Sequence, residues 1–209
     1  GIWRIAETES NYCSYNSYVS PYGDDCIQLG GYYRCWDIFV PENLSGEVPL
    51  VIDMHGFTAD PTGQREISGF KSLAESEGFI IVWPYGLCNS WNSGQKCCGA
   101  AVQDNIDDVG FIRKMVEQVS TRYDIDLNRV YATGLANGCS MSLRLVNEAS
   151  DLIAATACMS QYLLVPLNPE YSPVSMMEIH GTNDWACAYD PDFFQGAIQN
   201  FNTIKEMNG

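Results

Sequence analysis

Histidine and basic residues are scarce in this chain of 209 residues. His55 and His180 are its only histidines, each is followed by glycine, and no Cys-x-x-Cys pair occurs. Zinc sites are built from clusters of these residue types, so we expect no metal and no other cofactor. Eleven lysines and arginines face 26 acidic residues, which gives a net charge of −15 and a pI near 4.2. Such a chain repels nucleic acids and anionic membranes, and we expect neither as a partner.

Long apolar runs, internal repeats and domain linkers are also missing. No run approaches the roughly 18 apolar residues of a membrane-spanning helix. The length and the 46% hydrophobic content predict one globular domain over residues 1–209. No signal peptide begins at Gly1, and we interpret any such leader as already removed.

Cysteine, by contrast, is abundant. Without zinc-type spacing, nine cysteines favour disulfides in an oxidising compartment, so we predict a secreted, extracellular protein. The polar stretch 1–31 is predicted to be an extended arm held by disulfides. Cys139 and Cys158 are predicted to form disulfides or to pack in the core. The odd count implies a free thiol, a partner chain or a further segment, and the sequence does not determine the pairing. The cysteines are Cys13, Cys26, Cys35, Cys88, Cys97, Cys98, Cys139, Cys158 and Cys187.

Short apolar runs typical of buried strands alternate with segments of helical period. This alternation predicts an α/β fold with a mostly parallel central sheet and helices on both faces. The segment 85–102 is predicted to be a long loop. Strands are expected at 33–40, 49–54, 79–83, 130–133, 153–159 and 174–179, and helices at 64–77, from 107 onward, at 139–149 and at 193–207.

The run Gly134-Leu135-Ala136-Asn137-Gly138 lies between a predicted strand and a predicted helix. A sharp strand–helix turn with a glycine two residues on either side of its apex is the frame of a nucleophile elbow. Ala136 is at the apex, where a serine hydrolase has its attacking hydroxyl. The alternative is an ordinary strand–helix turn.

Two further turns follow predicted strands. They are His55-Gly56-Phe57-Thr58 and His180-Gly181-Thr182-Asn183-Asp184. Because sites in parallel sheets collect at the carboxyl ends of strands, we expect both turns to lie near Ala136. His180 is expected to be a structural hydrogen-bonding residue, and the adjacent acids Asp107 and Asp108 to favour a helix dipole without a catalytic task.

Seven segments in the same order give the chain a family resemblance. It resembles the secreted α/β-hydrolase esterases grouped with polyhydroxybutyrate depolymerases and feruloyl esterases, over about residues 30–189. The segments are PLVIDMHG at 49–56, GFIIVWPYG at 78–86, NSWN at 89–92, CCG at 97–99, IDDVGFI at 106–112, NRVYATG at 128–134 and HGTND at 180–184.

The resemblance implies a serine carboxylesterase with Ser-His-Asp chemistry. Ala136 then occupies the nucleophile position, Asp184 is the acid, and the backbone N–H groups of Phe57 and Asn137 form the oxyanion hole. Trp91 and Trp185, in loops expected near the pocket, are candidate substrate-binding residues. The expected substrate is a neutral ester or polymer. The sequence does not distinguish between a feruloylated sugar, a polyester oligomer and an acetylated glycan.

The sequence departs from the family pattern at two points. Serine is absent from the elbow, and no histidine follows Asp184. The resemblance therefore implies that the C-terminal strand and histidine loop are missing here, and that a C-terminal segment or a second chain carries the catalytic histidine. We expect this chain to be inactive as written. The alternative is a natural non-catalytic secreted binding protein on a hydrolase fold.

Overall fold

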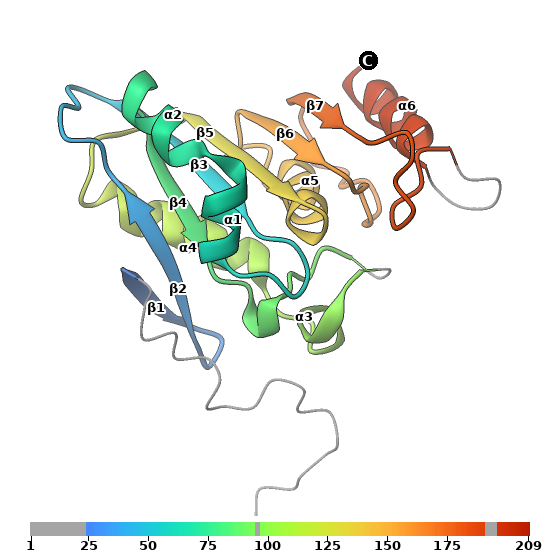
Figure 1. The fold of residues 1–209 in the computed structure, drawn as a ribbon, viewed down its shortest axis with the longest axis horizontal. Helices are drawn as coiled ribbons and strands as arrows, with labels where there is room; N and C mark the ends of the chain where they lie inside the picture. Colours follow the sequence, from blue (N-terminus) through green and yellow to red (C-terminus); the bar gives the residue numbers. More distant parts are fainter. Residues whose placement is uncertain (1–23, 95–96, 191–195) are drawn as a thin grey trace, which may run out of the picture.

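The computed structural model describes residues 24–94, 97–190 and 196–209 (Figure 1). Its centre is one seven-stranded sheet in the order β1-β2-β4-β3-β5-β6-β7. β1 and β2 run antiparallel to their neighbours, and the pairs from β4 to β7 are parallel. The strands are β1 (Asp25–Leu29), β2 (Tyr32–Phe39), β3 (Val48–Met54), β4 (Ile80–Pro84), β5 (Ile125–Leu135), β6 (Ala155–Met159) and β7 (Ser175–Ile179).

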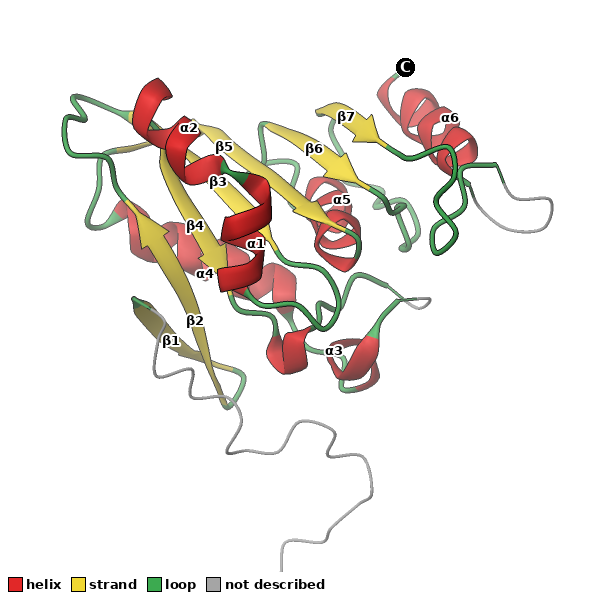
Figure 2. Ribbon diagram, in the orientation of Figure 1, coloured by secondary structure: helices red, strands yellow, loops and turns green. Residues whose placement is uncertain are grey.

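Helices lie on both faces of this sheet, which confirms the predicted fold class. Figure 2 shows α1 and α2 on one face and α4 and α5 on the other. The helices are α1 (Pro61–Ser68), α2 (Phe70–Glu77), the 3-10 turn η1 (Leu87–Asn89), α3 (Gly99–Gln103), α4 (Asp108–Ser120), α5 (Asn137–Glu148) and α6 (Ala197–Asn208). In the described parts of the chain, none of these helices has the length and apolar character needed to cross a membrane.

Three predicted elements differ from the structure. The helix expected at 64–77 is two helices, because Gly69 adopts φ 66° between α1 and α2. The helical period continues across this break, so periodicity alone could not detect it. The loop expected at 85–102 contains η1 and the start of α3. The final helix begins at Ala197, after Gly196 in extended backbone, and residues 193–195 of the expected helix lie outside the described residues.

The predicted N-terminal arm is partly regular structure. Residues 25–29 form β1, which turns back onto β2 through Gly30 and Gly31, both at positive φ. The Cys26–Cys35 disulfide crosses this hairpin. The rest of the arm, with Cys13, lies outside the described residues.

Asp107 and Asp108 lie at the start of α4, as expected, and Asp108 has a further role. Asp107 caps α4 by accepting from the Gly110 N–H, as acids at a helix start do. Asp108 is buried instead, with one oxygen 2.5 Å from Arg34 Nη2 and the other accepting from the Asn92 N–H at 2.7 Å. It therefore joins β2, α4 and the loop before α3 inside the core.

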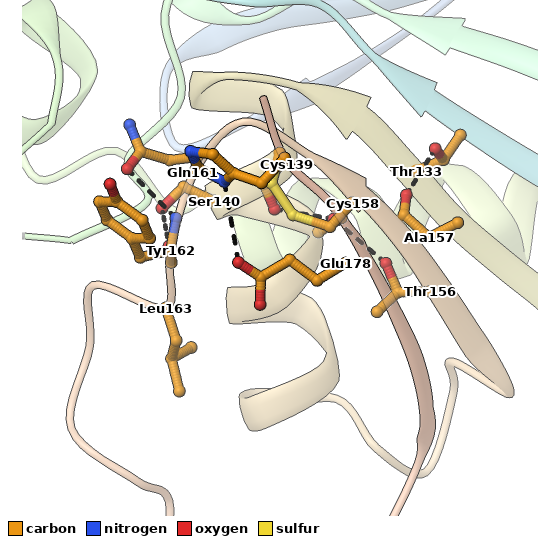
Figure 3. Close-up of a disulfide and its surroundings, with 12 residues drawn as sticks. Thr133, Cys139, Ser140, Thr156, Ala157, Cys158, Gln161, Tyr162, Leu163 and Glu178 are labelled. Atoms are coloured by element: carbon orange, nitrogen blue, oxygen red, sulfur yellow. Dashed lines mark hydrogen bonds and ion pairs between the residues drawn. A yellow bond between two sulfur atoms is a disulfide. The ribbon is translucent and has the colours of Figure 1, made fainter. Parts of the chain in front are cut away.

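Disulfides are present, as predicted from the cysteine count. Cys97 pairs with Cys98. Cys139 pairs with Cys158, which ties the first turn of α5 to β6 (Figure 3). Cys88 is also disulfide-bonded, and among the described residues Cys187 is a free thiol.

Candidate active site

The turn between β5 and α5 has the geometry of a nucleophile elbow. Its apex, Ala136, adopts φ 50° and ψ −116°, a conformation that residues with a side chain rarely take. The Ala136 N–H donates to Met159 O at 2.9 Å, and Ala136 O accepts from the Ser140 N–H at 3.0 Å. These bonds fix the apex between the end of β6 and the first turn of α5.

The two flanking glycines are required by close backbone contacts. A Cβ on Gly134 would lie 2.6 Å from Met54 O and 2.6 Å from the Gly138 carbonyl carbon. A Cβ on Gly138 would lie 2.1 Å from Met54 O. All three distances are shorter than real contacts of a Cβ atom, so β3, β5 and α5 can approach this closely only because these two positions lack side chains.

The turn after β3 lies directly against the elbow, as predicted. A Cβ built on Gly56 would be 3.7 Å from the Ala136 Cβ and 3.3 Å from Leu135 O. Phe57 is the next residue, and Asn137 is the first residue of α5, where backbone N–H groups have no partner within the helix. The structure thus brings together the three positions Phe57, Ala136 and Asn137.

The Asn137 side chain holds this frame, a role that sequence reasoning missed. It is fully buried, its Oδ1 accepts from the Trp91 N–H at 2.7 Å, and its Nδ2 donates to Trp91 O and to Ser93 Oγ. The partners are more than 40 positions away in sequence, so no local pattern indicated the contact. Asn137 therefore fastens the elbow to the loop that follows β4.

The expectation that Trp91 binds substrate is wrong. Its side chain is 0% exposed and its indole N–H donates to His55 O at 3.0 Å, so it belongs to the core beneath the turn. Trp185 is 94% exposed, in the loop that carries Asp184. Of the two tryptophans, only Trp185 is accessible to a ligand.

His55 is a buried structural residue. Its Nε2 accepts from the Gly86 N–H at 3.0 Å, so its proton is on Nδ1, which donates to Gly56 O at 2.8 Å. Burial lowers the pKa of His55 to about 4. The imidazole is neutral at physiological pH and both its nitrogens are occupied, so His55 cannot act as the base.

Asp184 lies in the loop after β7. Its Oδ1 accepts from the N–H groups of Ala186 and Cys187, both at 2.9 Å. Burial works to raise the pKa of Asp184, but these two N–H groups and the Ser160 hydroxyl outweigh it and hold the pKa below its ordinary value. The carboxylate is therefore ionised at neutral pH.

His180 holds the loop of Asp184 in place. Its Nε2 donates to Cys187 O at 2.6 Å and lies 3.7 Å from Asp184 Oδ2. Its ring stacks on Tyr162, with centroids 5.6 Å apart and planes 5° apart. Its Nδ1 lies 3.7 Å from the carboxyl of Glu178, whose pKa is raised by burial. These contacts are those of a structural hydrogen-bonding residue, as expected for His180.

The register of the sheet relates the elbow to the acid. Leu135 pairs with Met159, and Met159 pairs with Ile179, so β5, β6 and β7 end at the same edge. The Ser160 N–H, just past β6, donates to Ile179 O. Since neighbouring strands are about 4.8 Å apart, β5 and β7 are about 10 Å apart at this edge. One strand, β6, lies between the elbow and the loop of Asp184.

A separate groove of about 1020 Å³ runs along α5. Its lining includes Asn92, Arg144 and Pro166 but neither Ala136 nor Asp184. Arg144 is bonded to Glu148 and to Asn92 O, so its charge is already paired. Among the described residues, no cluster of three or more histidines, cysteines and acids has the arrangement of a metal site.

Comparison with known proteins identifies esterases as relatives. No protein-family model matches the chain. It is 28% identical over 167 residues to a bifunctional acetylxylan esterase/xylanase of Neocallimastix patriciarum, covering 78% of this chain and 23% of that protein. It is 26% identical over 191 residues to feruloyl esterase B of Piromyces equi, covering 81% and 34%. It is 30% identical over 122 residues to poly(3-hydroxyalkanoate) depolymerase C of Paucimonas lemoignei, covering 56% and 29%. The chain thus spans about a quarter to a third of the length of these relatives.

The solved structures that match include esterases. The crystal structure of a thermostable esterase superposes with a TM-score of 0.69 at 18% identity, covering 88% of this chain and 52% of that one. At this identity the match establishes the fold alone. The homologues of this chain are carboxylic ester hydrolases, and its fold is that of an α/β-hydrolase.

Proposed function

We propose that the chain carries the frame of a carboxylic ester hydrolase with Ser-His-Asp chemistry, in which Ala136 occupies the nucleophile position. The observation that carries the proposal is the positive φ of Ala136 between two glycines that admit no Cβ. Ordinary strand–helix turns have no need of this strained apex. Esterases among the relatives support the same reaction class.

The proposed role of each site residue is the one that the family resemblance implies for its position. A serine at 136 would project its hydroxyl from the apex toward the ester carbonyl. The backbone N–H groups of Phe57 and Asn137 would bind the developing oxyanion. Asp184, ionised at neutral pH, would orient an imidazole on the strand-end edge between itself and the apex. We propose that this imidazole comes from polypeptide that follows Gly209 or from a second chain.

The proposed substrate is a neutral acyl ester on a polymer, such as an acetylated or feruloylated plant polysaccharide. The net charge of −15 disfavours polyanions, and acetylxylan and feruloyl esterases are among the relatives. Trp185, exposed beside Asp184, is the proposed stacking surface for a sugar or an aromatic acyl group. The disulfides support secretion.

The direct test is Ala136→Ser in a polypeptide that continues past Gly209 into a histidine-bearing segment. Turnover of p-nitrophenyl acetate and methyl ferulate should rise by ~10⁶-fold over the Ala136 form, since a triad hydrolase loses about that factor without its nucleophile. Ala157→Ser, which adds the same hydroxyl to the neighbouring strand β6, is the matched control and should stay inert. A folded Ala136→Ser protein without turnover would refute the proposal.

The second candidate is a non-catalytic binding protein. One observation favours it, namely alanine at position 136, where a serine hydrolase has its nucleophile. It predicts that the chain as written binds acetylated or feruloylated xylo-oligosaccharides in titration calorimetry, and that Trp185→Ala weakens binding. Binding to a protein whose gene encodes Ala136, with no hydrolysis over days, would favour this function over the first.

A further inference from the structure

Three cysteines meet next to the loop of Asp184. Cys97 and Cys98 form one disulfide, and Cys187 is a free, half-buried thiol. Gln161 connects them, because its Nε2 lies 3.9 Å from Cys97 Sγ and its side chain is also hydrogen-bonded to the Cys187 thiol. The Cys97 sulfur and the Cys187 thiol thus have the side-chain amide of Gln161 as a common neighbour.

The position of Gln161 is itself fixed. It follows β6 and Ser160, and Figure 3 shows it beside Tyr162 near the Cys139–Cys158 disulfide. Its Oε1 accepts from the Tyr162 N–H at 3.1 Å, and Tyr162 stacks on His180. The shared contact of Gln161 with the two sulfurs therefore rests on a braced segment of backbone.

We propose that Cys187 and the Cys97–Cys98 disulfide form a thiol–disulfide exchange site. In the exchange the Cys187 thiolate attacks Cys97 Sγ, a Cys97–Cys187 bond forms, and the Cys97–Cys98 bond breaks. The electron pair of the broken bond stays on Cys98 as a thiolate, which takes up the proton that Cys187 released. One disulfide and one thiol are present before and after, so no oxidant or reductant is consumed.

The Cys97–Cys187 disulfide connects different parts of the chain from those that the Cys97–Cys98 disulfide connects. A Cys97–Cys98 bond joins neighbours in sequence, whereas a Cys97–Cys187 bond closes a loop of about 90 residues and restricts the unfolded chain far more. It also fixes Cys187, whose N–H donates to Asp184 Oδ1 and whose carbonyl accepts from His180 Nε2. The exchange thus tethers the Asp184 loop covalently to the segment before α3. It does not depend on the proposed hydrolase function.

The rate of exchange should rise with pH. Burial, with the Asp184 charge, raises the pKa of the Cys187 thiol, so only a small fraction is thiolate near neutrality. Below that pKa the thiolate fraction grows about tenfold per pH unit. Exchange at pH 8.5 should therefore be roughly 100-fold faster than at pH 6.5.

The experiment is disulfide mapping of the chain as it exists, with no substitution. Samples held at pH 6.5 and pH 8.5 are quenched with acid, free thiols are alkylated, and trypsin–chymotrypsin peptides are sequenced by mass spectrometry without reduction. The expected result is a Cys97–Cys187 cross-linked peptide with alkylated Cys98, appearing faster at pH 8.5. A sample in which Cys187 alone is alkylated at both pH values, even after days, would overturn the proposal.

Paired variants identify the sulfur that is attacked. With oxidised glutathione as oxidant, Cys98→Ser should form a Cys97–Cys187 disulfide with release of two reduced glutathiones, whereas Cys97→Ser should form no Cys98–Cys187 disulfide and should carry at most glutathione on its thiols. The oxidised Cys98→Ser protein should also melt on the order of 10 °C above Cys187→Ser. Pairing of Cys187 in Cys97→Ser but not in Cys98→Ser would overturn the assignment to Cys97.

Discussion

The backbone strain at Ala136 predicts an unusual effect of glycine. Glycine in place of alanine normally destabilises a protein by about 0.5–1 kcal/mol, because the unfolded chain gains conformational freedom. At Ala136 the conformation with φ 50° and ψ −116° costs on the order of 1–3 kcal/mol for any residue with a Cβ. The difference predicts that Ala136→Gly stabilises the fold by about 1 kcal/mol.

The matched control for this change is Ala157→Gly in the neighbouring strand β6. Ala157 is likewise half-buried but has ordinary strand geometry, so the same substitution should cost about 1 kcal/mol. Urea unfolding of the oxidised proteins, followed by tryptophan fluorescence, measures both free energies of unfolding. If Ala136→Gly destabilises as much as Ala157→Gly, the elbow is not strained and the reasoning fails.

Three further predictions concern the contacts around the elbow and the core. Gly138→Ala should lower the free energy of unfolding by about 3 kcal/mol or more, because the new Cβ would lie 2.1 Å from Met54 O. The control is Gly181→Ala, where the nearest atoms to a new Cβ are 4.0 Å away, and it should be nearly neutral in the same urea assay. Asp108→Ala should cost about 3–5 kcal/mol, since it leaves the buried Arg34 guanidinium without its charge partner, and a loss below 1 kcal/mol would show that the pair is not essential. Because burial lowers the pKa of His55 to about 4 from 6.5, its stabilising contribution is full above pH 6.5 and falls by about 3 kcal/mol as the pH drops to 4. The pH dependence of unfolding for His55→Gln should lack this fall, and an imidazole NMR titration that finds His55 charged at pH 6 would contradict it.

The strand and helix pattern could be predicted because it depends on local composition. The apolar runs at 49–54 and 79–83 became the central strands β3 and β4, and the glycines at 134 and 138 marked the elbow. The break at Gly69 was not predictable, since an αL residue between two helices leaves the periodicity intact. Boundaries near 99 and 197 failed for a related reason, because they depend on tertiary contacts rather than on the residues nearby.

Only those residues of the candidate site that directly follow a strand could be predicted from the sequence. Sequence reasoning placed Phe57, Ala136 and Asp184 at carboxyl ends of parallel strands, where the sheet brings them to one edge. The prediction for Trp91 was wrong because the sequence of a loop does not show whether a tryptophan in it is exposed or buried, and Trp91 is buried. Its burial depends on the bonds with Asn137 and His55, which are distant in sequence.

The contacts that hold the elbow explain how its frame persists without a nucleophile. The backbone at Gly134 and Gly138 packs closely against Met54 O. The Asn137 side chain forms hydrogen bonds with the backbone of Trp91. None of these contacts involves the side chain at position 136. Adding one hydroxyl there removes no packing and buries no new polar group within the core, so Ala136→Ser should change the free energy of unfolding by less than about 0.5 kcal/mol. The frame and the nucleophile are therefore energetically independent, and the strain at the apex is borne by the backbone whether or not a reactive atom is there.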